Sequence, residues 1–147
     1  MTTRRQGDAQ PLAAVDLGSN SFRLLIAREE GGQIVPISTH REGVRLAAGL
    51  DRDSALSQAK IEEACEALMR FRERLASIPA SRVRAVATST YRVATNRDAL
   101  LRASVDALGL PIDIISGPEE ARLIYLGCAH TLPWSEDQPV DHPVSLY

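Results

Sequence analysis

The first of three candidate functional segments is DLGSNSFR, which begins at Asp16 and separates two apolar stretches. A glycine and two serines in a turn bring backbone N–H groups and hydroxyls together, an arrangement that can cradle a phosphate group. Asp16 stands at the end of the preceding apolar stretch, where a carboxylate can hold a metal ion through water. The alternative is a plain turn in which Asn20 simply accepts a left-handed backbone conformation.

The second candidate segment is ATSTYRVATN, which begins at Ala87. Thr88, Ser89 and Thr90 supply consecutive hydroxyls that can cap a helix or turn, and Arg92 follows within one helical turn. An arginine near a helix N-terminus favours an anion, because the guanidinium and the backbone N–H groups both attract negative charge. The alternative is a surface arginine beside a hydroxyl cap.

The third candidate segment is SGPEEARLIYLG, which begins at Ser116 and holds two adjacent carboxylates at a predicted helix start. Ser116 and Glu119 match the capping-box spacing S-x-x-E, whereas a cap at Gly117 would place Pro118 at the first helical position. In both arrangements Glu120 takes no part in capping the helix. Glu120 is therefore a candidate general base toward a water that attacks phosphorus, and the alternative is a solvated glutamate at a helix start.

Apolar patterning predicts the strands that must position these segments, over residues 12–18, 21–30, 33–47, 83–89 and 112–116. Gly31-Gly32 is a hairpin signal between the second and third of them. Together with the helices described next, the order β-β-β-α-β-α-β-α predicts an α/β fold with a mixed five-stranded sheet and helical crossovers. Ligands of such sheets bind beyond the strand ends, where these loops gather.

Two helices are predicted before the third candidate segment. The first covers residues 57–78, ends at Pro79 and buries a stripe made of Ile61, Cys65, Leu68, Phe71 or Met69, Leu75 and Ile78. The second begins after Thr95 or Asn96 as its N-cap and closes at Gly109, ahead of Pro111.

Composition excludes several classes of protein. The 147 residues carry 17 Lys and Arg against 19 Asp and Glu, so a net charge of -2 offers no global attraction to nucleic acid or anionic lipid. Cys65 and Cys128 are too far apart for a paired-cysteine motif, and His40, His130 and His142 show no metal-ligand spacing. Without an apolar run long enough for a membrane span or a signal segment, a cytoplasmic protein is expected.

Four stretches together resemble, in order and spacing, the exopolyphosphatase and guanosine pentaphosphate phosphohydrolase (Ppx/GppA) family. They are AAVDLGSNSFRLLIA, GVRLAAGL, ATSTYRVATN and IISGPEEARLIYLG, and the resemblance runs from about Ala13 to Thr131. It implies a ribonuclease H-like, actin-like ATPase fold with two lobes around a phosphate-binding cleft. It also implies Mg²⁺-dependent release of the terminal phosphate of inorganic polyphosphate, or of the 5′ γ-phosphate of pppGpp.

The resemblance also implies a role for each matching residue. The family's catalytic base falls on Glu120 and its phosphate-binding arginine on Arg92. Its first phosphate loop falls on Asp16, Gly18, Ser19, Asn20 and Ser21, with Asn20 and Ser21 as the expected phosphate contacts; Asp16 is also the candidate metal residue named above, through water. Pro118 departs from the commoner acidic or polar residue, a change that the first helical turn tolerates.

The expected organisation is a disordered tail over residues 1–11, an N-terminal lobe over 12–132, and a linker with the start of a second lobe over 133–147. The family's second phosphate loop, D-I-G-G-G-S-T-E, is not found in the sequence. We therefore expect a truncated chain with half a site that is inactive alone. The alternatives are a non-catalytic lobe that binds phosphate or a nucleotide or forms a homodimer, and a kinase relative of the same fold.

Overall fold

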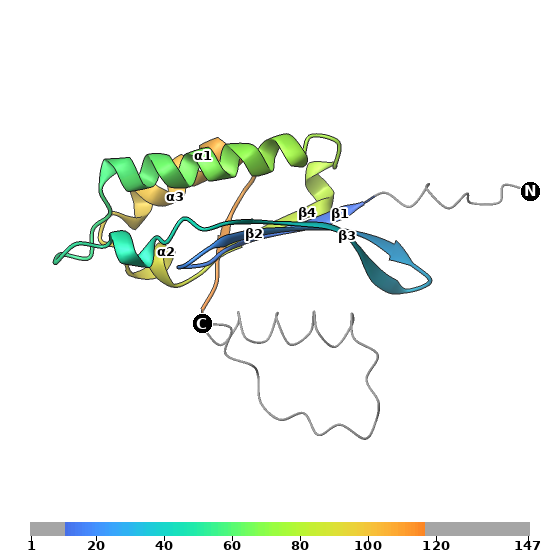
Figure 1. The fold of residues 1–147 in the computed structure, drawn as a ribbon, viewed down its shortest axis with the longest axis horizontal. Helices are drawn as coiled ribbons and strands as arrows, with labels where there is room; N and C mark the ends of the chain where they lie inside the picture. Colours follow the sequence, from blue (N-terminus) through green and yellow to red (C-terminus); the bar gives the residue numbers. More distant parts are fainter. Residues whose placement is uncertain (1–10, 117–147) are drawn as a thin grey trace, which may run out of the picture.

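The computed structural model describes residues 11–116, which form a five-stranded sheet in the order β3-β2-β1-β4-β5. Figure 1 shows the sheet below two helices. β2 runs antiparallel to both of its neighbours, whereas β1, β4 and β5 are parallel to one another. The strands are β1 (Leu12–Leu17), β2 (Phe22–Glu30), β3 (Gln33–Glu42), β4 (Val83–Ala87) and β5 (Asp113–Ile114). This mixed sheet confirms the predicted α/β, ribonuclease H-like fold class.

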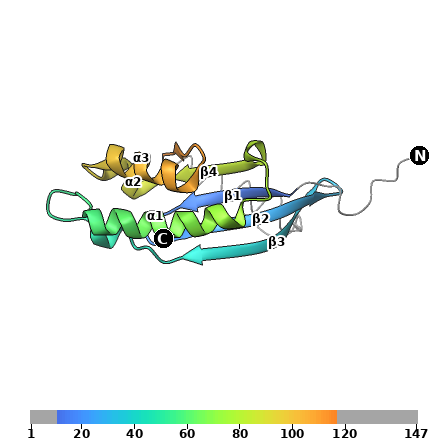
Figure 2. The same ribbon diagram turned by 90° about the horizontal axis from the view of Figure 1, so that it is seen from above.

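The helices are α1 (Gln58–Arg74), the five-residue α2 (Ser89–Val93) and α3 (Arg97–Leu108), with short 3₁₀ turns η1 (Ala47–Gly49) and η2 (Ala80–Arg82). α1 and α3 lie side by side across one face of the sheet (Figure 2). None of the helices within residues 11–116 has the length and apolar character needed to cross a bilayer. The predicted order did not include α2. The predicted helix with Glu119 and Glu120, most of the tail and the 133–147 segment lie outside the described residues.

Alternating side chains of the sheet form its contact with the helices. Val15 and Leu17 of β1 are fully buried beneath the helices, as are Phe22 and Leu24 of β2. The hairpin predicted at Gly31-Gly32 is confirmed, since both glycines have positive φ angles of 58° and 79°, as a tight turn between twisted strands requires.

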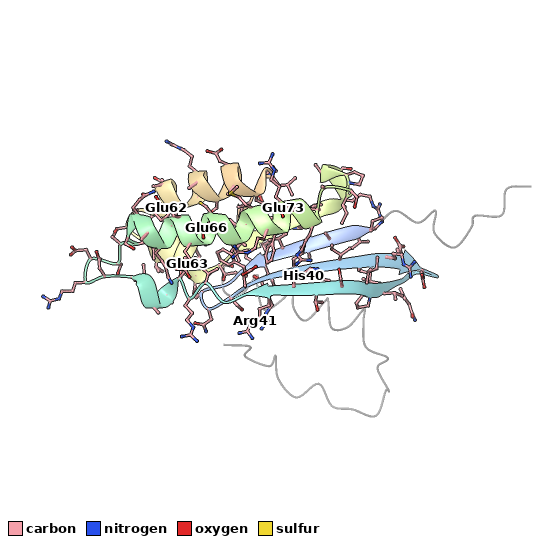
Figure 3. All side chains as sticks on the ribbon, turned by 45° about the horizontal axis from the view of Figure 1, so that its top comes forward. His40, Arg41, Glu62, Glu63, Glu66 and Glu73 are labelled. Atoms are coloured by element: carbon pink, nitrogen blue, oxygen red, sulfur yellow. The ribbon has the colours of Figure 1, made fainter. Side chains whose placement is uncertain are left out.

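Helix α1 follows the predicted amphipathic pattern with two differences. The side chain of its N-cap Ser57 accepts a hydrogen bond from the Lys60 N–H. Of the two residues predicted as alternatives, Phe71 is the buried one, whereas Met69 is 56% exposed. Cys65, which was predicted to be buried, is only partly buried. The helix ends at Arg74, although Leu75 and Ile78 remain buried in the turns that follow. Its outer side carries Glu62, Glu63, Glu66 and Glu73 (Figure 3), which are all exposed.

The third strand was predicted to continue to residue 47, and this was wrong. β3 ends at Glu42, whose carboxylate accepts hydrogen bonds from Nε and Nη2 of Arg70 on α1 at 2.7 and 3.1 Å. These bonds lower the pKa of Glu42. Val44 and Leu46 then turn into the core, which moves the chain off the sheet.

Asn96 occupies the N-cap position of α3, one of the two predicted, but its side chain does not cap the helix. Its Oδ1 accepts a hydrogen bond from the Leu56 N–H at 3.0 Å, and its Nδ2 donates to the Leu56 carbonyl at 2.9 Å. The side chain thereby pairs with a backbone 40 residues away. At the other end, Gly109 closes the helix with a φ of 76°, as predicted.

Asn96→Ala is expected to lower the free energy of unfolding by about 1–3 kcal/mol, because the Leu56 N–H and carbonyl lose their partner in a partly buried site. Urea denaturation measures the change. Asn96→Asp is the matched control, since it keeps the acceptor and loses the donor, and its loss should be smaller at pH 7. Equal stability of Asn96→Ala and the unsubstituted protein would contradict this account.

Candidate functional site

Two of the predicted functional segments meet at the carboxyl ends of β1 and β4, which are neighbouring parallel strands. The Thr88 N–H donates to the Leu17 carbonyl at 3.2 Å, so the chain leaving β4 lies against the end of β1. Beyond this point Thr90 Oγ1 donates to Ser19 Oγ at 3.2 Å, joining residues 71 positions apart. Figure 1 shows α2 next to the turn between β1 and β2. The parallel pairing of the two strands is what brings these hydroxyls together.

The turn between β1 and β2, residues 18–21, is closed by a hydrogen bond from the Gly18 N–H to the Ser21 carbonyl at 3.1 Å. A Cβ at position 18 would lie 3.0 Å from that same oxygen, so the close approach favours glycine. Among the described non-glycine residues only Arg45 and Ser54 have a positive φ. The alternative of a turn built on a left-handed Asn20 is therefore wrong.

A third segment, which was not predicted to touch this turn, supports it from outside. The Arg45 N–H donates to the Asn20 carbonyl at 2.9 Å, and the Ala47 N–H donates to the Ser19 carbonyl at 3.1 Å. These residues belong to the GVRLAAGL stretch, which the family resemblance included without a role. Two backbone hydrogen bonds thus hold the turn in one position.

Asp16 lies next to last in β1, on the face of the sheet opposite Val15 and Leu17. Its direct neighbour across the antiparallel pair is Arg23 of β2. Asp16 Oδ1 is buried and finds no hydrogen-bond partner among residues 11–116, as is also true of Thr88 Oγ1. Burial raises the pKa of the Asp16 carboxyl above its ordinary value, and the charge of Arg23 partly offsets that rise.

An unpartnered, partly desolvated carboxylate oxygen suits a cation. Mg²⁺ is usually bound through one or two carboxylates, with waters and phosphate oxygens completing its shell. Within the described part of the chain, no group of three or more His, Cys, Asp or Glu side chains is placed to hold a metal ion. The residues present therefore fit a metal held by Asp16 together with water and ligand oxygens.

Asp16→Asn is expected to stabilise the protein at pH 7 by about 1 kcal/mol, because the substitution removes a poorly solvated negative charge. A raised native pKa means that the native state binds more protons than the unfolded state. Stability should therefore fall as the pH rises from about 3.8 through the raised native value, and stay lower above it.

Urea denaturation at pH 3 and pH 7 tests this expectation. The gain from Asp16→Asn should be present at pH 7 and shrink toward pH 3, where the carboxyl is protonated in both states. Asp113→Asn removes an exposed charge from β5 and should show no comparable gain. A loss of stability on Asp16→Asn at pH 7 would mean that the carboxylate has a stabilising partner.

Arg92 lies four positions after Thr88, the N-cap of α2, and so within one turn of a helix N-terminus as predicted; because α2 is only five residues long, the same position also falls in its last turn. Thr88 is the N-cap by position and makes no side-chain capping bond. The Arg92 side chain reaches the residue that follows β5: Nη1 donates to the Ile115 carbonyl at 2.9 Å, and Nη2 lies 3.5 Å from Ser89 Oγ. Arg92 is thus half-buried and held at the point where the chain enters the third candidate segment.

Tyr91, between Thr90 and Arg92, is a residue that the sequence analysis did not single out. It is fully buried, its ring centroid lies 6.5 Å from that of Phe22, and its hydroxyl lies 2.9 Å from Ser104 Oγ. Ser104 Oγ already donates to the Leu100 carbonyl at 2.7 Å, so Tyr91 is the donor in their shared bond. Burial raises the pKa of Tyr91, which stays neutral. The only signal in the sequence was an aromatic residue within a polar stretch.

The structure therefore places Asp16, the 18–21 turn and α2, which carries Arg92, at the end of the sheet where the parallel strands β1 and β4 finish. Glu120, the remaining predicted site residue, lies outside the described residues. The catalytic and binding roles of all these residues stay predictions.

Comparison with known proteins identifies the family. The sequence profile of the Ppx/GppA phosphatase family matches residues 25–141. A Ppx/GppA enzyme of Aquifex aeolicus is similar in structure, with 30% identity and a TM-score of 0.76 over 86% of this chain and 42% of its own. An exopolyphosphatase of Cytophaga hutchinsonii shows 25% identity and a TM-score of 0.75 over 84% of this chain and 40% of its own.

An exopolyphosphatase-like protein shows 31% identity and a TM-score of 0.70 over 78% of this chain and 35% of its own. The chain thus spans about 40% of the length of the Aquifex aeolicus and Cytophaga hutchinsonii chains and somewhat less of this third one. The family profile covers most of the sequence, and the fold of these solved structures is the one described above. The chain therefore belongs to the Ppx/GppA phosphatase family.

Proposed function

We propose that the chain supplies the phosphate-binding part of a phosphoanhydride hydrolase. The reaction is release of the terminal phosphate from inorganic polyphosphate, or of the 5′ γ-phosphate from pppGpp. The observation that carries this proposal is the contact between Thr90 and Ser19, which joins the 18–21 turn to α2 near Asp16, whose buried Oδ1 has no hydrogen-bond partner among residues 11–116. The similarity to an exopolyphosphatase supports the reaction class.

Hydrolysis of a phosphoanhydride needs positioning and charge neutralisation more than covalent work by the protein. In our proposal Asn20 and Ser21 contact the phosphate, with Ser19 and the backbone beside Gly18 completing the cradle. The Arg92 guanidinium neutralises the phosphate oxygens. The contacts of Thr90, Arg45 and Ala47 hold the 18–21 turn before any ligand arrives. The phosphate-binding groups of the turn therefore need little reorganisation on binding.

Asp16 is the residue that would hold Mg²⁺, through its buried Oδ1, which has no hydrogen-bond partner within the described part of the chain. A bound Mg²⁺ supplies positive charge to the phosphate oxygens. The half-buried position of Asp16 keeps its carboxylate poorly solvated, which favours an exchange of water for a cation.

Glu120 is the proposed general base that accepts a proton from the attacking water. The bond from Arg92 to the Ile115 carbonyl supports this role indirectly, because it fixes the chain five residues ahead of Glu120. We further propose that this lobe binds phosphate but hydrolyses little by itself, since it corresponds to about 40% of the length of the solved relatives.

Phosphate release from polyphosphate and from pppGpp in the presence of Mg²⁺ tests the proposal. It is measured for the chain alone and for the chain joined to the part of the Aquifex aeolicus relative that it does not match. Release by the joined form, abolished by Glu120→Gln, is the expected result. Phosphate binding without release in either form would favour a non-catalytic binding lobe, and absence of both would contradict the proposal.

A further inference from the structure

Arg45 adopts a backbone conformation that arginine rarely takes. Its φ is 55°, and only Ser54, at 57°, shares this left-handed conformation among the non-glycine residues of the described chain. Glycine adopts it at lower cost because it lacks the Cβ that crowds a neighbouring carbonyl oxygen, and asparagine because its short polar side chain can hydrogen-bond locally. A long cationic side chain at such a position therefore calls for an explanation beyond the turn itself.

Ser54 has a local explanation that Arg45 lacks. The turn around Ser54 is built by Asp51, whose Oδ1 accepts hydrogen bonds from the Asp53 and Ala55 N–H groups at 2.8 and 2.9 Å. The Ser54 N–H also donates to the Asp51 carbonyl at 3.0 Å. The Arg45 guanidinium, in contrast, forms no hydrogen bond or ion pair with any group of residues 11–116.

The backbone around Arg45 is nevertheless tightly held. Its neighbours Val44 and Leu46 are 3% and 0% exposed, so both insert into the core and the Arg45 side chain is directed to solvent. The Arg45 N–H is bonded to Asn20 at the centre of the 18–21 turn. An exposed cation without a side-chain partner among residues 11–116 is therefore held through its backbone next to the proposed phosphate cradle.

The other two arginines of the site have other partners or roles: Arg92 is the proposed contact of the phosphate in the cradle, and Arg23 faces the Asp16 carboxylate. Arg92 also donates to the Ile115 carbonyl. A single phosphate in the cradle leaves the neighbouring phosphate of a chain without a counter-charge. A guanidinium fork matches the oxygens of a phosphate group in geometry and charge.

We infer that Arg45 binds the phosphate next to the one held by the 18–21 turn, and so selects a chain of anhydride-linked phosphates over a single phosphate. This inference rests on the proposed function of the same site. The ligand class is a linear phosphate chain, either inorganic or attached to a nucleoside. The backbone hydrogen bond to the Asn20 carbonyl holds the base of the arginine beside the turn.

The test compares Arg45→Asn with the unsubstituted 147-residue chain. Asparagine accepts the left-handed backbone, so this variant removes the cation and keeps the turn, and Arg45→Gly serves as a second variant with the same property. Arg102→Asn, at an exposed position on α3, is the control for loss of one positive charge. Titrations followed by amide NMR shifts give the affinities for orthophosphate, tripolyphosphate and GTP, each with Mg²⁺.

The expected result is a loss of roughly tenfold in tripolyphosphate affinity for Arg45→Asn, as for one charge-assisted hydrogen bond. Orthophosphate affinity should change by less than about twofold, since a single phosphate does not reach the second contact. Arg102→Asn should leave both affinities unchanged. An equal loss with GTP would show that the shared phosphate chain is recognised, and a loss with tripolyphosphate alone would assign the inorganic chain as the ligand.

Two results would overturn the inference while the proposed function survives. In the first, Arg45→Asn and Arg45→Gly bind tripolyphosphate as tightly as the unsubstituted chain. In the second, they lose orthophosphate and tripolyphosphate affinity by the same factor, which would place Arg45 at the first phosphate. If the unsubstituted chain bound neither ligand, the phosphate cradle itself would be refuted, and the inference with it.

Discussion

Arg92→Gln is expected to lower kcat/KM for phosphate release from polyphosphate by about 10²–10³-fold, the effect typical of losing one preorganised donor to a developing charge. Arg92 is half-buried, and its guanidinium is anchored by the Ile115 carbonyl and Ser89 Oγ, so it is already oriented before substrate binds. Glutamine is too short and neutral to replace either function. The measurement is made in the joined form that releases phosphate.

Two controls separate a specific contact from a general change in charge. Arg92→Lys keeps the positive charge but loses the planar fork, so an intermediate loss is expected. Arg84→Gln removes a charge from an exposed position on β4, on the side away from the 18–21 turn, and should leave kcat/KM unchanged. If Arg92→Gln and Arg84→Gln had equal effects, Arg92 would have no role beyond net charge.

Tyr91→Ala is expected to lower the free energy of unfolding by about 3–5 kcal/mol, the usual cost of removing a large buried ring. The Tyr91 ring is fully buried and lies near Phe22, and its hydroxyl forms a hydrogen bond with Ser104 of α3. α2 is too short to be stable by itself, so this packing is what holds Thr90 and Arg92 in place. Urea denaturation followed by circular dichroism gives the loss.

Tyr91→Phe is the matched variant, since it keeps the ring and removes only the hydroxyl. Its expected cost is about 0.5–1.5 kcal/mol, because Ser104 retains its bond to the Leu100 carbonyl. Val93→Ala, at a side chain 57% exposed on the same short helix, should change stability by no more than about 0.5 kcal/mol. A loss below about 1.5 kcal/mol for Tyr91→Ala would show that the core around α2 readjusts to fill the cavity.

The sequence by itself determined those features whose causes lie within a few residues along the chain. The glycines at 31, 32 and 109 take the positive φ angles that their turns need, and Ser57 caps α1 through the adjacent backbone. The apolar spacing around Ile61 and Leu68 is likewise a local pattern, and it correctly predicted the buried side of α1. Such signals depend on backbone sterics and helical periodicity, which need no tertiary contact.

Only the tertiary structure decided how the site is assembled. The contact of Ser19 with Thr90 follows from the pairing of β1 with β4, and no residue near either position encodes that register. The end of β3 at Glu42 likewise coincides with a tertiary contact, because Arg70 of α1 donates a hydrogen bond to the Glu42 carboxylate there. Asn96 stands at the N-cap of α3, one of the two positions predicted, but only the tertiary structure shows that its side chain pairs with the Leu56 backbone, 40 residues away, and does not cap the helix. Desolvation of Asp16 also depends on its neighbours in space, since a carboxylate becomes poorly solvated only when strands on both sides enclose it.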